Sequence, residues 1–209
     1  MTSTDATDAR GRLARRRVDK FEERRRLLAD AALQTLAERG YARTSLRDIA
    51  QGSDFSLGVL HYYFRDKVEL ITYCVRRYKA QCTERYDAIA AHATDAEALL
   101  RDAGDGLAAT LAHDALMHRL WYDLRAQALF EESFRFDVAD IDASLERMIW
   151  RIVAAYADLV GVAPRCTAGL AYAAFDGLFQ QSLLRHLSGD AAALDDLRAG
   201  TRVLLTRLV

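Results

Sequence analysis

Almost nothing in this sequence interrupts a helix. The 209 residues include one proline, Pro164, and proline is the residue that most strongly breaks a helix interior. The chain is otherwise rich in Ala, Leu and Arg, which are good helix formers. We therefore expect an all-α protein.

Apolar spacing and capping residues divide the chain into about nine helices. Ser45 and Ser56 are expected N-caps of two short helices, and Asp66 is expected to cap a longer one. Pro164 is expected in the first turn of a later helix, where its missing N–H costs nothing. The expected helices lie at residues 21–39, 45–51, 57–64, 67–91, 95–113, 114–130, 140–160, 164–187 and 190–209.

Charge divides the chain into two parts with different expected tasks. Residues 1–79 hold 17 Lys and Arg against 11 Asp and Glu, whereas residues 80–209 hold 12 against 19. Asymmetry of this kind indicates a front end that faces nucleic acid and a back end with another task. Residues 1–18 have no apolar periodicity, and we expect them to form a disordered basic tail.

The sequence argues against the secreted, membrane and enzyme classes. Three cysteines without a C-x-x-C pair suit a reducing compartment, and neither a signal-peptide core nor an apolar run of about 18 residues occurs. The five histidines lack metal-ligand spacing, and no phosphate-binding glycine loop is present. We expect a cytoplasmic protein with no membrane partner, no cofactor and no enzyme activity, and a helical enzyme is the weaker alternative.

Residues 45–64 fit a helix-turn-helix, in which a short second helix enters the DNA major groove. Gly52, Ser53 and Asp54 supply the turn between the two short helices. Gly58 lies in the first turn of the second helix, where a missing side chain lets DNA approach the backbone. The residues that can form the small internal core are Leu46, Ile49, Ala50, Phe55, Leu60 and Phe64.

The other faces of these helices provide the expected DNA contacts. Ser56 and the helix N-terminus behind it can hold one phosphate, and Lys67 can hold another. The complete expected DNA-binding set is Thr44, Ser45, Ser56, Leu57, Gly58, Val59, His61, Tyr62, Tyr63 and Lys67.

The stretch GYARTSLRDIA from Gly40, followed by SLGVLHYYFRDK from Ser56, resembles the DNA-binding domain of the tetracycline-repressor (TetR-type) family. The spacing of the two stretches agrees with that family position by position. Two residues depart from the pattern: Asp54 stands where the family usually has a turn glycine, and His61 where a tyrosine is frequent. Asp tolerates the left-handed backbone of such a turn, whereas His61 is expected to alter base or phosphate contacts.

The resemblance implies an N-terminal three-helix domain at residues 19–66 and a helical effector-binding and dimerisation domain at residues 67–209. It also implies a homodimer built mostly from helices 8 and 9, expected at 164–187 and 190–209, and a small-molecule cavity among helices 4 to 8. The apolar residues of the last two helices fit that interface or the intrachain core. These residues are Leu170, Ala174, Leu178, Leu194, Leu197, Leu204 and Leu208.

Several side chains of the back half could line such a cavity, although aromatic residues also prefer a plain core. The expected effector-binding set is His118, Trp121, Tyr122, Arg125, Trp150, Phe175 and Phe179. The leading hypothesis is a repressor that binds a pseudo-palindromic operator as a homodimer and is released by an unknown small molecule. An activator, an architectural DNA-binding protein without an effector, and a purely structural helical protein are the alternatives.

Overall fold

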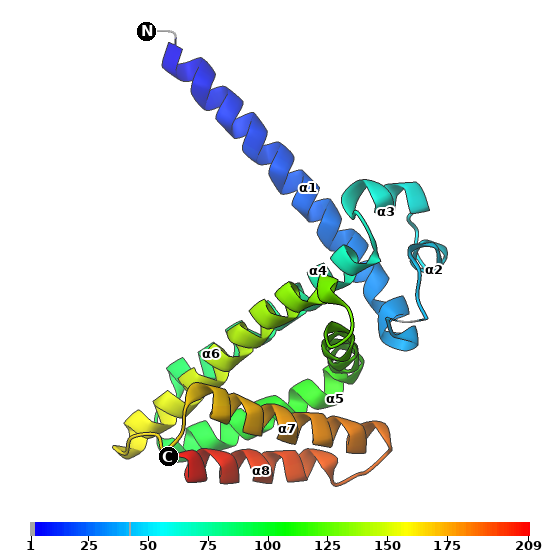
Figure 1. Ribbon diagram of the computed structural model, residues 1–209. Coiled ribbons are helices and arrows are strands. Elements are labelled where there is room, and N and C mark those ends of the chain that lie inside the picture. The colour runs from blue at the N-terminus through cyan, green and yellow to red at the C-terminus, as the bar shows by residue number, and fades with distance from the viewer. Residues whose placement is uncertain (1–2, 42) are drawn as a thin grey trace. The chain divides into compact units, whose positions relative to one another are not determined.

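The computed structural model describes residues 3–41 and 43–209, with side chains described from residue 18 onward except at 34, 37 and 38. All regular elements of this described part are helices, which confirms the expected all-α fold (Figure 1). None of these helices is both long enough and apolar enough to cross a membrane. The elements are α1 (Ser3–Arg39), α2 (Leu46–Gln51), α3 (Leu57–Tyr63), α4 (Lys67–His92), α5 (Ala96–Ala128), η1 (Glu132–Phe134), α6 (Arg135–Val160), α7 (Ala168–Leu187) and α8 (Ala193–Leu208).

The chain divides into two compact units, Met1–Cys74 and Val75–Val209, and the boundary between them falls inside α4. In the first unit, one face of α1 packs against the three helices that follow it. The fully buried side chains of this core are Leu28, Ala32, Leu36, Ile49, Leu60, Leu70 and Ile71. Their burial supplies the apolar free energy that a pair of helices of six and seven residues cannot supply alone.

Side-chain caps fix where α2 and α3 begin. Ser45 is the N-cap of α2, as expected, and forms a capping box with Asp48: the Ser45 hydroxyl accepts from Asp48 N, and the Asp48 carboxylate accepts from Ser45 N at 2.8 Å. The Ser45 hydrogen bonds lower the pKa of the Asp48 carboxyl below its usual value. Ser56 caps α3 by accepting from Val59 N at 3.3 Å. The two short helices therefore begin where the sequence predicts.

The N-terminal tail differs from its sequence-based expectation. A disordered segment was expected at 1–18, but α1 begins at Ser3 and continues without a break to Arg39; residues 1 and 2 lie outside the described part. The physical reason is that these residues include Ala and Arg and no proline, so the helix that packs from Phe21 onward extends backward unhindered. The helix ends as predicted at Gly40, whose φ of 76° is the left-handed cap favoured by glycine.

The second unit contains fewer separate helices than expected. The segments expected at 95–113 and 114–130 are one helix, α5, which is kinked at Asp114, where φ is −117° and ψ is 20°. The structure therefore has eight α-helices in its described part where about nine were expected. The start predicted for the second segment coincides with the kink, because the same residue that could cap a new helix interrupts the old one.

Close packing of α8 explains two glycines of this unit. Helices α7 and α8 lie side by side in Figure 1, and a Cβ at Gly200 would be 2.9 Å from Leu178 Cδ1. A Cβ at Gly104 of α5 would be 3.4 Å from the backbone of Arg198. Leu178 therefore packs within the chain, and Leu197 of α8 is fully buried as well.

The single proline is not part of a helix. Pro164 was expected in the first turn of the helix at 164–187, but α7 begins at Ala168. Thr167 is its N-cap and accepts from Leu170 N at 3.3 Å. A side-chain cap close to the first apolar residue thus determines the start, and Pro164 lies in the preceding loop.

Candidate functional sites

Helix α3 presents a mixed face to the solvent. Leu60 and the following Phe64 anchor it in the core of the first unit, whereas His61 and Tyr62 are exposed. Ser56 and Gly58 are exposed at its N-terminal end, and Leu57, Val59 and Tyr63 are half-buried. Most of the expected DNA-binding residues of this helix therefore lie at least partly on the surface.

Gly58 lies beside open space in the described part of the chain. Among the described residues, a Cβ at this position would meet only Ser56 Oγ, at 4.0 Å. Alanine would make a better helix at this position than glycine does. The open space beside Gly58 instead fits a requirement that comes from outside the chain.

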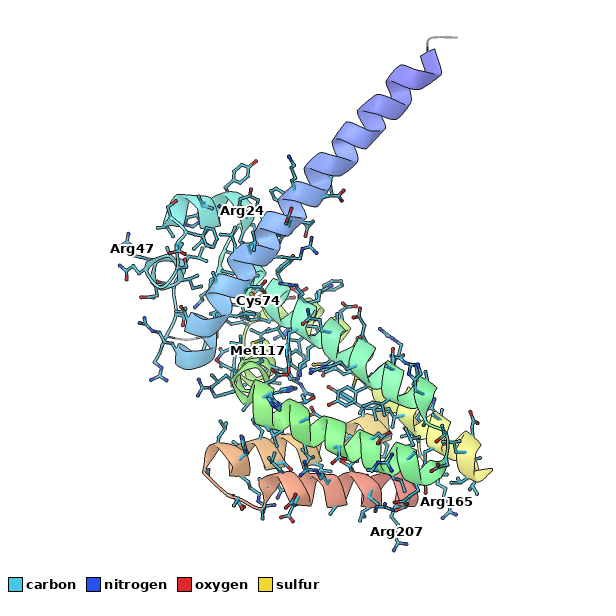
Figure 2. The ribbon with its side chains drawn as sticks, turned by 180° about the vertical axis from the view of Figure 1, so that it is seen from behind. Arg24, Arg47, Cys74, Met117, Arg165 and Arg207 are labelled. Carbon is cyan, nitrogen blue, oxygen red and sulfur yellow. The ribbon has the colours of Figure 1, made fainter. Side chains whose placement is uncertain are left out.

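A groove of about 670 Å³ lies beside this face. Helices α2 and α3 and the start of α4 form it, and it is rich in positive charge. Figure 2 shows Arg47 projecting outward from α2. The lining residues are Arg43, Thr44, Ser45, Leu46, Arg47, Asp48, Leu57, His61, Arg65, Asp66 and Lys67. Arg43, Arg47 and Arg65 are exposed cations that were absent from the expected set, although the charge count of the N-terminal part pointed to such residues.

Two of the expected DNA-binding residues are engaged inside the chain. Thr44 is buried, and its hydroxyl donates to the Gly40 carbonyl at 2.8 Å, so its side chain closes the turn after α1 and is not a surface group. Lys67 Nζ donates to the Tyr41 carbonyl at 2.9 Å and lies 3.8 Å from the centre of the Tyr41 ring. Lys67 thereby joins the start of α4 to the loop that precedes α2.

The second unit contains a cavity of about 60 Å³ with mainly apolar walls. Five of the seven expected effector-binding residues line it, and all five come from α5 and α7. The lining residues are Lys79, Cys82, Tyr86, Leu107, Thr110, His118, Trp121, Tyr122, Leu145, Met148, Ile149, Tyr172, Phe175, Asp176 and Phe179. The other two, Arg125 and Trp150, are not among the lining residues.

Arg125 belongs to a charge network at one side of the cavity. Its guanidinium donates to Asp176 at 2.5 Å and lies 3.4 Å from Asp142. The Tyr122 hydroxyl also donates to Asp176, at 3.0 Å, and the Tyr172 hydroxyl donates to Asp142. Burial raises the pKa of Asp142, opposed by the Tyr172 hydrogen bond and by Arg125. Each carboxylate therefore has both a cation and a phenol as partners.

A second polar group on the cavity wall is built around His118. Lys79 Nζ is 3.0 Å from His118 Nδ1, and the Tyr78 hydroxyl is 2.9 Å from Nε2. Burial, and then the charge of Lys79, holds the pKa of His118 well below its usual value, so the imidazole is neutral and Nδ1 can accept from the ammonium. Burial also lowers the pKa of Lys79 to about 8.

Sequence reasoning found the aromatic wall and missed most of its polar groups. Lys79, Tyr172 and Asp176 line the cavity but were not in the expected set. Two other aromatic residues of the back half, Phe130 and Phe136, are more than three-quarters exposed. Helical spacing alone does not predict which aromatic residues line the cavity and which are exposed, because the kink in α5 and the short η1 helix change which face points inward.

Helix α7 has an exposed apolar face. Leu170 and Leu184 are 58% and 61% exposed, and Ala173 and Gly177 lie between them on the same stripe. A Cβ at Gly177 would meet no atom of the described residues within 4 Å. On α8, Val203 is exposed in the same way. Exposed apolar stripes of this kind that include small residues suit packing against another helix.

The first unit contains a segment that matches a known protein family. Residues 28–74 match the model of bacterial regulatory proteins of the tetR family. The HTH-type transcriptional regulator PksA of Bacillus subtilis (strain 168) is 35% identical over 69 residues, which cover 33% of this chain. The match spans about a third (34%) of the length of that relative.

Solved structures match nearly the whole fold at low identity. A TetR transcription regulator from Haloarcula marismortui ATCC 43049 has a TM-score of 0.73 at 19% identity, with 90% of this chain and 98% of that one covered. The transcriptional regulator FadR from Bacillus subtilis, solved in complex with stearoyl-CoA, has a TM-score of 0.69 at 17% identity, with 87% and 97% covered. These likenesses establish that the second unit shares the fold of such regulators.

Proposed function

We propose that this chain, whose residues 28–74 match the model of the tetR family of bacterial regulatory proteins, is a ligand-responsive transcriptional repressor of that family. A homodimer binds a pseudo-palindromic operator through the α3 helices, and a small molecule in the cavity of the second unit releases it. The observation that carries this proposal is the exposed N-terminal end of α3, with Gly58 open to the outside, beside the basic groove.

The groove supplies the charge that sequence-independent attraction to phosphate requires. Arg43, Arg47 and Arg65 would contact the DNA backbone, and the exposed part of α3 would read base edges in the major groove. Ser56 would hold a phosphate at the helix N-terminus. Lys67 is proposed to reach a phosphate as well as to hold Tyr41.

Selection of bound duplexes from random DNA tests the proposal directly. We expect the full-length protein to select two inverted half-sites whose centres are about one helical turn, roughly 34 Å, apart. Binding to the selected site should weaken steeply as salt rises, because phosphate contacts release counterions. Selection of no sequence, or of single unpaired half-sites only, would contradict the proposal.

Gly58→Ala should raise the stability of the protein and lower its affinity for the operator. The added methyl group meets open space in the free protein, so we expect the free energy of unfolding to rise by about 0.5 to 1 kcal/mol. The same methyl would lie between α3 and the DNA, and we expect operator affinity to fall at least roughly tenfold, a loss of about 1.4 kcal/mol. Chemical denaturation and gel-shift titration measure the two effects.

A matched control is available at Gly169, which is the second residue of α7 as Gly58 is the second residue of α3. In the part of the chain that the structure describes, a Cβ there would meet only Glu146, at 3.9 Å. Gly169→Ala should bring a similar gain in stability and leave operator affinity unchanged. If Gly58→Ala and Gly169→Ala both bound the operator as tightly as the wild type, DNA would not approach the backbone at Gly58.

The exposed stripe on α7 supports the proposed dimer. Leu170, Ala173 and Gly177 would let the α7 helices of two protomers approach closely, with Val203 of α8 at the edge of the contact. The same region was expected to form the interface from its sequence, although Leu178 and Leu197 pack within the chain.

The cavity and α4 support the proposed release by a ligand. Helix α4 carries Lys67 at its start and the cavity residue Lys79 farther along, so one continuous helix contributes to both units. A ligand can shift the operator-binding equilibrium only if it binds one conformer of the protein more tightly than the other. The bound stearoyl-CoA of the FadR structure supports a ligand site in this fold. An architectural protein without an effector would not require a cavity that is lined by a buried lysine, Lys79.

A further inference from the structure

Lys79 is a buried cation without an anionic partner. Its side chain is 5% exposed, and its ammonium is hydrogen-bonded to the imidazole of His118. Within the described residues, no carboxylate oxygen lies at ion-pair distance from Nζ. An ammonium has three hydrogen-bond donors, and lysine is almost never fully buried unless it is paired. The cavity that Lys79 lines is the place where a missing partner can bind.

Trp121 provides a second, independent sign of a missing acceptor. Its indole lines the same cavity, and its Nε1 is buried with no hydrogen-bond partner in the described part of the chain. Lys79 Nζ lies 5.4 Å from the Trp121 ring. A buried tryptophan N–H ordinarily finds a partner. Two neighbouring groups therefore have donor capacity that the described residues leave unused: the Trp121 N–H has no acceptor, and the Lys79 ammonium has His118 but no anion.

The other charges on this side of the cavity are matched. Arg125 is bonded to Asp176 and close to Asp142, and each carboxylate also accepts from a tyrosine. A cationic ligand would have to displace Arg125 from these carboxylates and would lie close to Lys79. An anionic ligand would instead neutralise Lys79, which has no carboxylate partner among the described residues.

We infer that the effector is a small apolar carboxylic acid bound as its carboxylate, which accepts hydrogen bonds from Lys79 Nζ and Trp121 Nε1. This inference rests on the proposed function, in which the cavity holds the effector. The neutral His118 imidazole positions the ammonium by accepting from it. The hydrocarbon or aromatic body of the acid would contact the apolar wall formed by Leu107, Leu145, Met148, Ile149, Phe175 and Phe179.

A matched series of head groups tests the inference on the full-length protein. The probes are hexanoate, octanoate and phenylacetate, each compared with the primary amide and the primary amine of the same skeleton. Isothermal titration calorimetry at pH 7 measures their binding. We expect at least one of the acids to bind at least tenfold more tightly than its amide and its amine. The inference is overturned if no acid binds, or if an amide or amine binds as tightly as its acid.

Two cavity variants and one control identify the groups that bind the acid. Lys79→Met should weaken acid binding at least tenfold, and Trp121→Phe should weaken it several-fold, because each removes one donor. Lys20→Met, a change of the same kind at an exposed lysine of α1, should have no effect. Unchanged acid binding in Lys79→Met, with folding verified by circular dichroism, would overturn the assignment; Lys79→Gln provides a second uncharged variant.

Measuring which compounds release the operator distinguishes an error in this inference from an error in the proposed function. If a neutral or cationic compound releases the selected operator and the acids do not, the protein is a ligand-responsive repressor but its effector is not an acid. If the acids bind in the calorimeter and none affects operator binding, the cavity assignment stands and the proposed release mechanism fails.

Discussion

Leu184→Glu should convert the protein to a monomer and lower its affinity for a two-half-site operator by about a hundredfold or more. Leu184 is 61% exposed on the apolar stripe of α7. A two-fold interface brings the same patch of both protomers together, so a glutamate there would be desolvated near its own copy. In a dimer, binding of one half-site holds the second α3 at a high effective concentration near the other half-site, which raises the overall affinity by about 10² to 10⁴. A monomer loses this gain.

Light scattering after size-exclusion chromatography measures the mass, and gel-shift titration measures the affinity. Leu129→Glu is the control, because Leu129 is 75% exposed at the end of α5, outside the stripe on α7. This control should remain dimeric and bind the operator normally. A dimeric Leu184→Glu variant with normal affinity would remove α7 from the proposed interface.

Lys79→Met should stabilise the protein at neutral pH, even though it removes the proposed effector contact. Burial lowers the pKa of Lys79 from 10.5 to about 8, and the free-energy cost of that shift is up to about 3 kcal/mol. Methionine has a similar length, fits an irregular apolar wall and carries no charge. Urea unfolding at pH 7 should therefore give a higher midpoint for the variant than for the wild type.

The difference in stability between the wild type and Lys79→Met should depend on pH. Below pH 8 both the folded and the unfolded wild type bind the Lys79 proton, and the cost of burying the charge is complete. Between pH 8 and 10.5 only the unfolded state retains the proton, so the wild type gains stability relative to Lys79→Met as the pH rises. Lys20→Met should show no such trend. A constant difference between wild type and Lys79→Met from pH 7 to 10 would contradict the buried, charged state of Lys79.

Local signals in the sequence were sufficient for the starts of α2 and α3 and for the end of α1, although not for the start of α1. Ser45, Asp48 and Ser56 determine helix starts through hydrogen bonds to residues three positions away, and Gly40 ends α1 through its own backbone conformation. Such interactions depend on neighbours in the sequence and can be read from it. The start of α7 was misplaced because two local signals competed, and the Thr167 cap prevailed over Pro164.

The cavity was only partly predictable because burial depends on tertiary packing. The aromatic residues of α5 and α7 were identified from their type, but Lys79 follows Arg76, Arg77 and Tyr78 and resembles one more charge of a solvated basic segment. Its burial results from packing against His118 and Trp121, which are about forty residues away in the sequence. Asp142 of α6 and Asp176 of α7 are partners of Arg125 of α5 because three helices far apart in the sequence pack together.

The chain has two tryptophans, and only one of them, Trp121, lines the cavity. Replacing Trp150 by phenylalanine would leave a single indole whose emission reports on the cavity alone. A nearby ammonium perturbs the excited state of an indole, so a ligand that pairs with Lys79 should shift the emission wavelength and intensity. The protein thus contains its own optical probe, with which compounds can be screened before any operator is known.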